Sequence, residues 1–292
     1  MHRYLLHNGQ IRQTNDLLLS PGQVGFLNGW GVFSTIRVAK GVLFAYERHY
    51  RRMRQDAALM HVEFAISPEE LSAQLYRLIE ANNAHDATLR VSCVRNKGGL
   101  FEAPGIHRNS DLIAFTADRN NWGTGASLMS LPHSRYGASP FAGTKVTSWA
   151  QNLTWYEAAH QQGFDEMLLL NEHGQISECT SANIFSIDGG NVWTPPLATS
   201  GCLPGVTRAI LLEEIKLDGI NIAERELSMA DVINGRGVFI TSSTRDLLPV
   251  SEIDGVKLQQ SPELLGRLQE SFAGYREDYI ARHRKSNEVL TV

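Results

Sequence analysis

The sequence predicts an α+β fold, mixed α/β in character, with two domains of unequal size. Short apolar runs bounded by turn formers are typical of strands, whereas other stretches repeat their apolar residues at helical spacing. Residues 118–125 (D-R-N-N-W-G-T-G) follow neither pattern and are rich in turn-forming residues. We therefore expect a small N-terminal domain over residues 1–119, a linker over residues 120–125 and a larger domain over residues 126–292.

The N-terminal region is predicted to contain several strands and two helices. One helix is expected over residues 47–60, where apolar residues recur at helical spacing. A second helix, over residues 68–84, has Leu71 and Leu75 on its apolar face and Ser67 as a suitable N-cap. The strands are expected at residues 4–7, 10–13, 34–39, 42–46, 88–94 and 111–117.

The C-terminal region is predicted to contain more strands than helices. No internal repeat or low-complexity segment interrupts it. The strands are expected around residues 126–131, 166–170, 183–187, 191–193, 220–224 and 237–241, and the helices over residues 152–162, 205–217 and 262–281.

Charge and cysteine content argue against several classes of function. The net charge of −4 arises from 31 acidic and 27 basic residues without a block of one sign, so nucleic acid and anionic membranes are poor candidate partners. No apolar run approaches the roughly 20 residues of a membrane span, and the N-terminus lacks the apolar core of a signal peptide. Cys93, Cys179 and Cys202 suit neither a disulfide framework nor a metal site. A cytoplasmic protein without a metal centre is therefore expected.

Three segments in turn carry a lysine, an acid and a helix start. Lys145 follows small residues in A-G-T-K, and Glu178 lies in I-S-E-C-T-S-A-N-I-F. Residues 201–208, G-C-L-P-G-V-T-R, are typical of a loop that opens a helix. A protein that uses pyridoxal 5′-phosphate (PLP) must hold its aldehyde on a lysine, keep its pyridine nitrogen protonated and anchor its phosphate. The three segments supply one candidate group for each task.

Each of these groups also has a plain structural interpretation. Lys145 alone is more simply a surface charge, and Glu178 alone fits a polar turn that faces water. The free N–H groups of the helix start, with the Thr207 hydroxyl, suit a phosphate, but they equally describe an ordinary helix N-terminus. Residues 241–244 (T-S-S-T), after an apolar strand, offer a second anion site or an ordinary turn.

The order of these motifs along the chain resembles the class IV, fold type IV PLP enzymes. That superfamily includes branched-chain aminotransferases, D-amino-acid aminotransferases and aminodeoxychorismate lyases. N-G-W-G-V-F-S-T-I-R-V (28–38), E-R-H-Y-R-R-M (47–53) and T-S-S-T-R-D-L-L-P-V (241–250) also match, so the likeness extends from about residue 6 to residue 250. The resemblance implies a small N-terminal α/β domain, a larger C-terminal β-barrel-like α/β domain that binds PLP, and a homodimer.

The resemblance also implies roles for individual residues. Lys145 would be the catalytic residue, holding PLP as a Schiff base and moving protons, and Glu178 would bind the pyridine nitrogen. Leu203 would pack against the cofactor ring. The phosphate would be bound by Arg52, Val206, Thr207 and either Ser243 or Thr244.

Residues for the substrate are harder to choose from the sequence. In D-amino-acid aminotransferases, the region that corresponds to the loop over residues 95–108 supplies basic residues that bind a substrate carboxylate, and an arginine suits a carboxylate well. A solvated loop, or an ion pair for Arg245, is the alternative. The candidate substrate residues are Phe33, Arg95, His107 and Arg245.

The motifs favour an aminotransferase that moves an amino group between a small amino acid or amine and a 2-keto acid. Branched-chain aminotransferases usually have tyrosine and glutamate where this chain has Asn28 and Ser34, which weakens a branched-chain assignment. The second interpretation is an aminodeoxychorismate lyase that releases pyruvate and 4-aminobenzoate. A non-catalytic PLP-binding protein is the third, although binding alone would not require Lys145.

Overall fold

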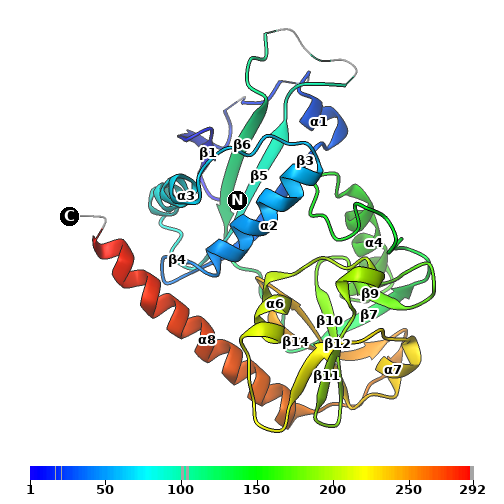
Figure 1. Cartoon of the computed structure of the whole chain (residues 1–292). Coiled ribbons are helices and arrows are strands. Elements are labelled where there is room, and N and C mark those ends of the chain that lie inside the picture. Colours follow the sequence, from blue (N-terminus) through cyan, green and yellow to red (C-terminus); the bar gives the residue numbers. More distant parts are fainter. Residues whose placement is uncertain (17, 21, 100–101, 103–104, 290–292) are drawn as a thin grey trace. The chain divides into compact units, whose positions relative to one another are not determined.

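The computed structural model describes residues 1–16, 18–20, 22–99, 102 and 105–289. It forms two compact units (Figure 1). The first unit contains Met1–Asn120, Thr144–Trp149 and the chain from Arg276 onward, and the second contains Asn121–Gly143 and Ala150–Tyr275. The segment that carries Lys145 therefore belongs to the first unit.

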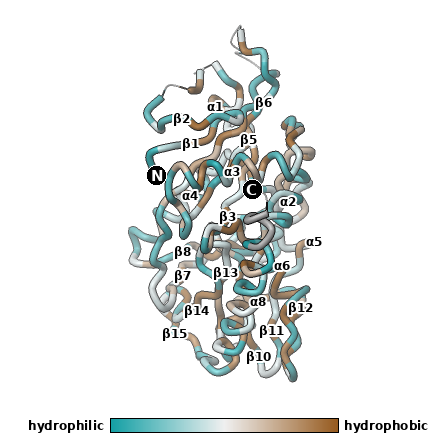
Figure 2. Tube along the Cα trace, turned by 90° about the vertical axis from the view of Figure 1, so that its left-hand side faces the viewer, coloured by the Kyte–Doolittle hydropathy of each residue, from teal (hydrophilic) through white to brown (hydrophobic). Residues whose placement is uncertain are grey.

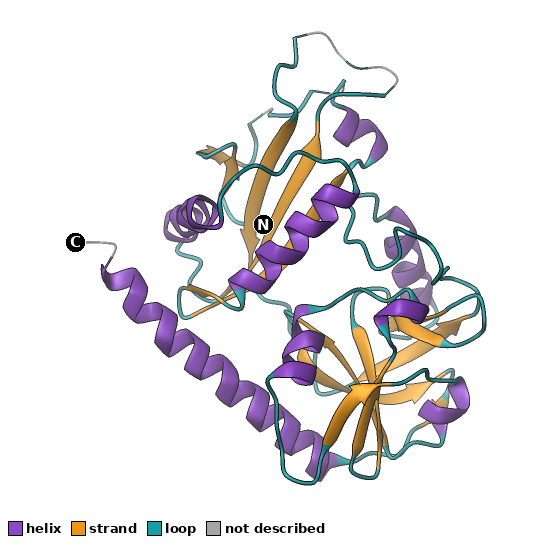
Figure 3. Ribbon diagram, viewed as in Figure 1, coloured by secondary structure: helices purple, strands orange, loops and turns teal. Residues whose placement is uncertain are grey.

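The first unit is built on a six-stranded antiparallel sheet in the order β2-β1-β6-β5-β3-β4. Helices α2 and α3 accompany this sheet (Figure 3). The elements of the unit are β1 (Tyr4–His7), β2 (Gln10–Gln13), α1 (Val24–Asn28), β3 (Gly31–Ala39), β4 (Val42–Leu43), α2 (Tyr46–Leu59), α3 (Pro68–Asn82), β5 (Ala87–Arg95) and β6 (Ser110–Ala117).

The core of the first unit lies between the sheet and these two helices. Val32, Ile36 and Val38 alternate along β3, so they point to one face of the sheet, and all three are buried. Leucines of α3 and Met53 and Ala57 of α2 belong to the same cluster. The Ser67 side chain accepts the backbone N–H of Glu70, which confirms it as the N-cap of α3.

Two strands of the first unit have boundaries three residues from the expected ones, for local reasons. β3 begins at Gly31 rather than at Ser34, because residues 31–33 still pair with β5. The strand expected over residues 42–46 ends at Leu43, because Ala45 adopts a left-handed conformation (φ 53°) and starts α2. The short helix α1 was not expected from the sequence.

The Lys145 segment docks on the start of β3. Val146 forms an antiparallel bridge with Val32, and the Thr147 N–H and hydroxyl donate to the carbonyls of Gly31 and Gly29 at 2.9 and 2.7 Å. Gly29 has a φ of 59°, and a Cβ there would lie 2.8 Å from the Ser148 Cα. The close approach of the two backbones therefore requires glycine.

The second unit contains a larger sheet that curls into a half-barrel. Its strand order is β12-β11-β10-β13-β14-β7-β8-β9, with β15 paired to β14. β7 pairs in parallel with both β8 and β14, and β11 pairs in parallel with β12. The elements are β7 (Ala126–Leu131), α4 (Ala150–Gln161), β8 (Glu166–Leu170), β9 (Ile176–Cys179), β10 (Asn183–Asp188), β11 (Asn191–Thr194), α5 (Leu197–Ser200), α6 (Val206–Glu213), β12 (Asn221–Glu224), α7 (Met229–Ile233), β13 (Gly237–Ser242), β14 (Asp246–Ile253) and β15 (Val256–Lys257).

The strands of the second unit are strongly buried. All five residues of β8 and all four of β9 are buried, although no strand was predicted over residues 176–179. Brown, hydrophobic stretches recur along the strands of both units in Figure 2. The mixed α+β architecture predicted from the sequence is thus confirmed within each unit.

The last helix, α8 (Pro262–Val289), is longer than expected. Its residues from Arg276 onward belong to the first unit, where the Tyr279 hydroxyl donates to Glu47 at 2.8 Å and accepts the N–H of Tyr46 at 3.2 Å. Among the described residues, no helix has the length and apolar character needed to cross a membrane.

The docking of the Lys145 segment predicts a large effect of Gly29→Ala. The new Cβ meets the Ser148 backbone and alanine disfavours the left-handed conformation, so the free energy of unfolding should fall by about 2 kcal/mol or more. Urea unfolding measures this change. The matched control is Gly266→Ala in α8, where nothing lies within 4 Å of the new Cβ and a small gain in stability is expected. Equal stability of the two variants would contradict the proposed close approach.

Candidate functional site

The side chain of Lys145 lies among aromatic rings in the first unit. Its Nζ is 4.5 Å from the centroid of the Phe33 ring and 5.6 Å from that of Trp149. The two rings meet edge to face with their centroids 5.9 Å apart. Phe33 is buried and Lys145 is half-buried, so the amine lies beside an apolar ring. The structure thus brings Lys145 and Phe33, two residues singled out from the sequence, into contact.

Arg52 lies in a buried polar cluster between α2 and β3. Its Nη2 donates to the Ser34 hydroxyl at 3.0 Å, and the same hydroxyl is hydrogen-bonded to His49 Nδ1 at 2.9 Å. Burial, reinforced by the positive charges of Arg52 and Lys145, holds the pKa of His49 well below its usual value. The imidazole is therefore neutral, and Arg52 supplies positive charge to this cluster.

Arg90 is a residue of this region that the sequence analysis missed. It opposes Thr35 in the β3–β5 register, so it shares the Phe33 face of the sheet, and its guanidinium carbon lies 3.7 Å from the Phe33 ring centroid. Burial lowers its pKa. Within the described part of the chain its side chain has no hydrogen bond or ion pair. A single charge inside the strand A-T-L-R-V-S-C-V was the signal that could have revealed it.

Arg95 and His107, expected to contact substrate, lie at the two ends of a loop. The Arg95 guanidinium stacks on Trp30 at 4.2 Å and donates to the carbonyls of Lys97 and His61. His107 is exposed. Residues 100, 101, 103 and 104 of this loop lie outside the described residues.

In the second unit, Glu178 is buried in β9 rather than exposed in a turn. One carboxylate oxygen accepts the backbone N–H of Leu203 at 3.0 Å, and the other accepts Arg135 Nη2 at 3.1 Å. The Asn183 amide donates to the Leu203 carbonyl at 2.9 Å and lies 3.5 Å from Glu178. Cationic and N–H donors stabilise the ionised form of a buried carboxylate. The arrangement brings Glu178 and Leu203, both predicted site residues, together.

The start of α6 has the features of an anion site. Its N-cap is Gly205, which has no side chain to satisfy the first N–H groups of the helix. A Cβ at this position would collide with the amide oxygen of Asn183, so glycine is required. Val206 and Thr207, both predicted to contact phosphate, are buried in the first turn. The first N–H groups of a helix have no acceptor within the helix, and together with the helix dipole they favour a bound anion here.

Ser243 and Thr244 lie in the turn between β13 and β14. The hydroxyls of Ser242 and Thr244 are 3.4 Å apart, and the N–H of Arg245 donates to Ser242 at 3.2 Å. The Thr241 hydroxyl is buried and lacks a hydrogen-bond partner among the residues that the structure describes. The turn therefore presents several hydroxyl groups in a small region.

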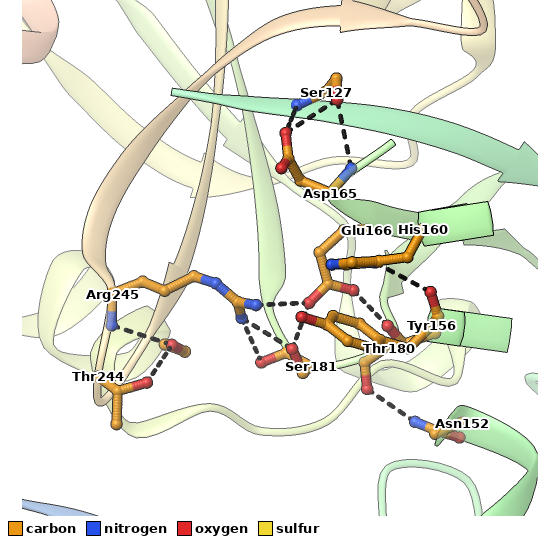
Figure 4. A network of polar contacts seen from close by, with 11 residues as sticks. Ser127, Asn152, Tyr156, His160, Asp165, Glu166, Thr180, Ser181, Thr244 and Arg245 are labelled. Carbon is orange, nitrogen blue, oxygen red and sulfur yellow. Dashed lines mark hydrogen bonds and ion pairs between the residues drawn. The ribbon is translucent and has the colours of Figure 1, made fainter. Parts of the chain in front are cut away.

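Arg245 forms a buried ion pair instead of an open cationic site (Figure 4). Its Nη2 lies 2.7 Å from Glu166, and the two side chains are 3% and 1% exposed. Nη1 donates to the Ser181 hydroxyl at 2.8 Å, and the guanidinium stacks on Trp122 at 3.7 Å. Thr180 and Ser181 also donate to Glu166. This is the ion-pair alternative considered for Arg245, and we leave Arg245 out of the substrate site.

The buried pair predicts a strong effect of Arg245→Met. Removing the guanidinium leaves the Glu166 charge buried without its partner, so the free energy of unfolding should fall by about 3–5 kcal/mol. Chemical denaturation measures the loss. Lys257→Met is the control, because Lys257 pairs with Glu252 at an exposed position and should cost under about 1 kcal/mol. Similar losses in both variants would contradict the assigned burial of the pair.

The comparisons with known proteins agree with this geometry. Residues 31–253 match the family model described as amino-transferase class IV. The chain is 26% identical over 255 residues to the D-alanine aminotransferase of Bacillus licheniformis, covering 86% of this chain and 88% of that protein.

Two solved structures are similar over nearly the whole chain. The branched-chain amino acid aminotransferase of Escherichia coli has a TM-score of 0.86 at 24% identity, over 94% of this chain and 95% of that one. A hypothetical aminotransferase from Mycobacterium tuberculosis, in its PLP-bound form, has a TM-score of 0.82 at 22% identity, over 94% and 99% of the two chains. The similarity to the Escherichia coli structure confirms the expected fold type. From its match over residues 31–253, the chain belongs to the amino-transferase class IV family of enzymes.

Proposed function

We propose that this protein is a PLP-dependent aminotransferase that moves an amino group between a small amino acid or amine and a 2-keto acid. The observation that carries the proposal is the grouping of Lys145 and Arg90 beside the same buried aromatic ring, Phe33. The Lys145 amine can form a covalent bond with a carbonyl carbon, and the Arg90 cation can bind a carboxylate. Amino acids and 2-keto acids present both of these groups.

The donor groups of the chain fit PLP. The buried Glu178 carboxylate, already held by Leu203 N–H and Arg135, suits a protonated pyridine nitrogen. The first turn of α6, with a glycine N-cap whose Cβ position is closed by Asn183, suits a phosphate. Lys145 would hold the aldehyde carbon covalently. Leu203 would contact the ring, and the phosphate would be bound by Arg52, Val206, Thr207 and Ser243 or Thr244.

The residues of the chain would divide the work of catalysis between them. When bound, PLP supplies an electron sink that lets the substrate α-carbon lose a proton. The Lys145 amine would accept that proton on its Nζ and later donate it from the same atom. Glu178 would keep the pyridine nitrogen protonated, because a fixed carboxylate stabilises the adjacent positive charge. Phe33 and Trp149 would exclude water from the amine.

Arg90 would orient the substrate through its carboxylate. One face of the guanidinium stacks on Phe33, so its edge is the part that can bind a carboxylate through two hydrogen bonds. Burial strengthens such a bond relative to one in water.

We also propose a homodimer, supported by the exposure of the apolar side chains Phe26 and Leu27 on α1, at 62% and 49%.

Lys145→Ala should abolish amino transfer, because no other group is assigned to hold the cofactor covalently. The experiment incubates the protein with PLP and 2-oxoglutarate and offers L-leucine, L-glutamate with pyruvate, D-alanine or an (R)-amine as donor. The wild type should convert at least one donor, and that donor defines the stereochemistry. The control is Lys257→Ala, an exposed lysine in β15. Full activity of Lys145→Ala would refute the assignment, and release of pyruvate from aminodeoxychorismate without amino transfer would indicate the lyase.

Arg90→Gln should weaken binding of carboxylate substrates selectively. Losing one charged hydrogen-bonding partner should raise the KM for the 2-keto acid by about tenfold to a hundredfold. The KM for an amine donor without a carboxylate should change little, which makes this donor the internal control. Equal increases in the two KM values would show that Arg90 does not bind the substrate carboxylate.

A further inference from the structure

Asp56 lies on the side of α2 that faces the Lys145 segment. It is one turn after Arg52 in the helix and is 7% exposed. The backbone N–H of Lys145 donates to its Oδ2 at 3.3 Å. A buried carboxylate on a helix thus accepts a main-chain hydrogen bond from a residue 89 positions further along the chain.

The carbonyl on the other side of Lys145 is also fixed. It accepts the backbone N–H of Phe33 at 3.1 Å, and Val146 then bridges to Val32. The Asp56 contact and the Phe33 contact therefore hold the peptide groups before and after the Lys145 side chain. A backbone fixed at both points leaves only side-chain rotation to move the amine.

The Asp56 carboxylate also belongs to the charged surroundings of the amine. Burial raises its pKa, while the charges of Arg52 and Lys145 and the Lys145 N–H oppose that rise. The other titratable group of this cluster, His49, is buried and neutral, so Arg52 and Lys145 are the cations that Asp56 balances. Because an electrostatic interaction acts on both groups, a negative charge on Asp56 attracts the positive charge of the Lys145 amine.

We propose that Asp56 is a positioning residue for Lys145, which fixes the main chain of the lysine beside Phe33 and favours the charged form of its amine. The inference rests on the proposed function for the importance of Lys145, but the hydrogen bond itself is independent of it. Asp56 acts through Lys145 and is assigned no contact with cofactor or substrate.

The first test measures hydrogen–deuterium exchange of the protein without added cofactor, in peptides that cover residues 144–149. Asp56→Ala removes the acceptor, so the Lys145 amide should exchange about tenfold faster. Asp56→Asn keeps an oxygen acceptor and should restore slow exchange. The matched control is Gln55→Ala, which changes an exposed neighbour on the same helix and should leave exchange unchanged. Unchanged exchange in Asp56→Ala would overturn the positioning role.

The second test isolates the charge and applies even if Asp56→Ala fails to fold. Absorbance follows the binding of PLP to the wild type and to Asp56→Asn across a pH series. Without the negative charge, the pH midpoint for covalent binding should fall by about half a unit to one unit. An unchanged or higher midpoint would overturn the electrostatic part of the proposal. Loss of amino transfer in Lys145→Ala tests the proposed function separately, so the two failures are distinguishable.

Discussion

The pairing of the Lys145 segment with β3 is the interaction on which the first unit's chemistry depends. The hydrogen bonds of Lys145 and Thr147 with residues 29–33 and Asp56 join parts of the chain more than 80 positions apart. The pairing needs glycine at position 29, because the two backbones approach too closely for a Cβ. Once it forms, Lys145, Phe33 and Arg90 meet at one face of the sheet.

Buried charges in the second unit are compensated in two different ways. Glu166 and Arg245 satisfy each other, and neighbouring hydroxyls complete their hydrogen bonds, so this pair fixes the loops around it (Figure 4). Glu178 is held by Arg135 and by a backbone N–H. The charge of Glu166 is thus balanced by a neighbouring arginine and hydroxyl groups, whereas Glu178 combines an arginine with a main-chain donor from the segment that leads into α6.

Local patterns predicted much of the fold and the individual groups of the candidate site. The α3 helix with its Ser67 cap and the strands β1 and β2 follow from neighbouring residues, whereas Lys145 and Glu178 were singled out only by the order of the motifs along the chain. Contacts between distant segments were not predictable in this way. The partner of Arg245, Glu166, lies 79 positions away, and Arg90 meets Phe33 only through strand pairing. β9 was missed because its acidic residue, Glu178, is buried, and its partners Arg135 and Leu203 come from other segments of the chain.

The most direct test of the account is to locate the cofactor on the chain. The protein is mixed with PLP, reduced with borohydride and digested, and mass spectrometry identifies every modified lysine. One stoichiometric modification is expected, on Lys145, because among the described lysines only its amine lies beside the rings of Phe33 and Trp149. Stoichiometric modification of a different lysine, or none at all, would contradict it.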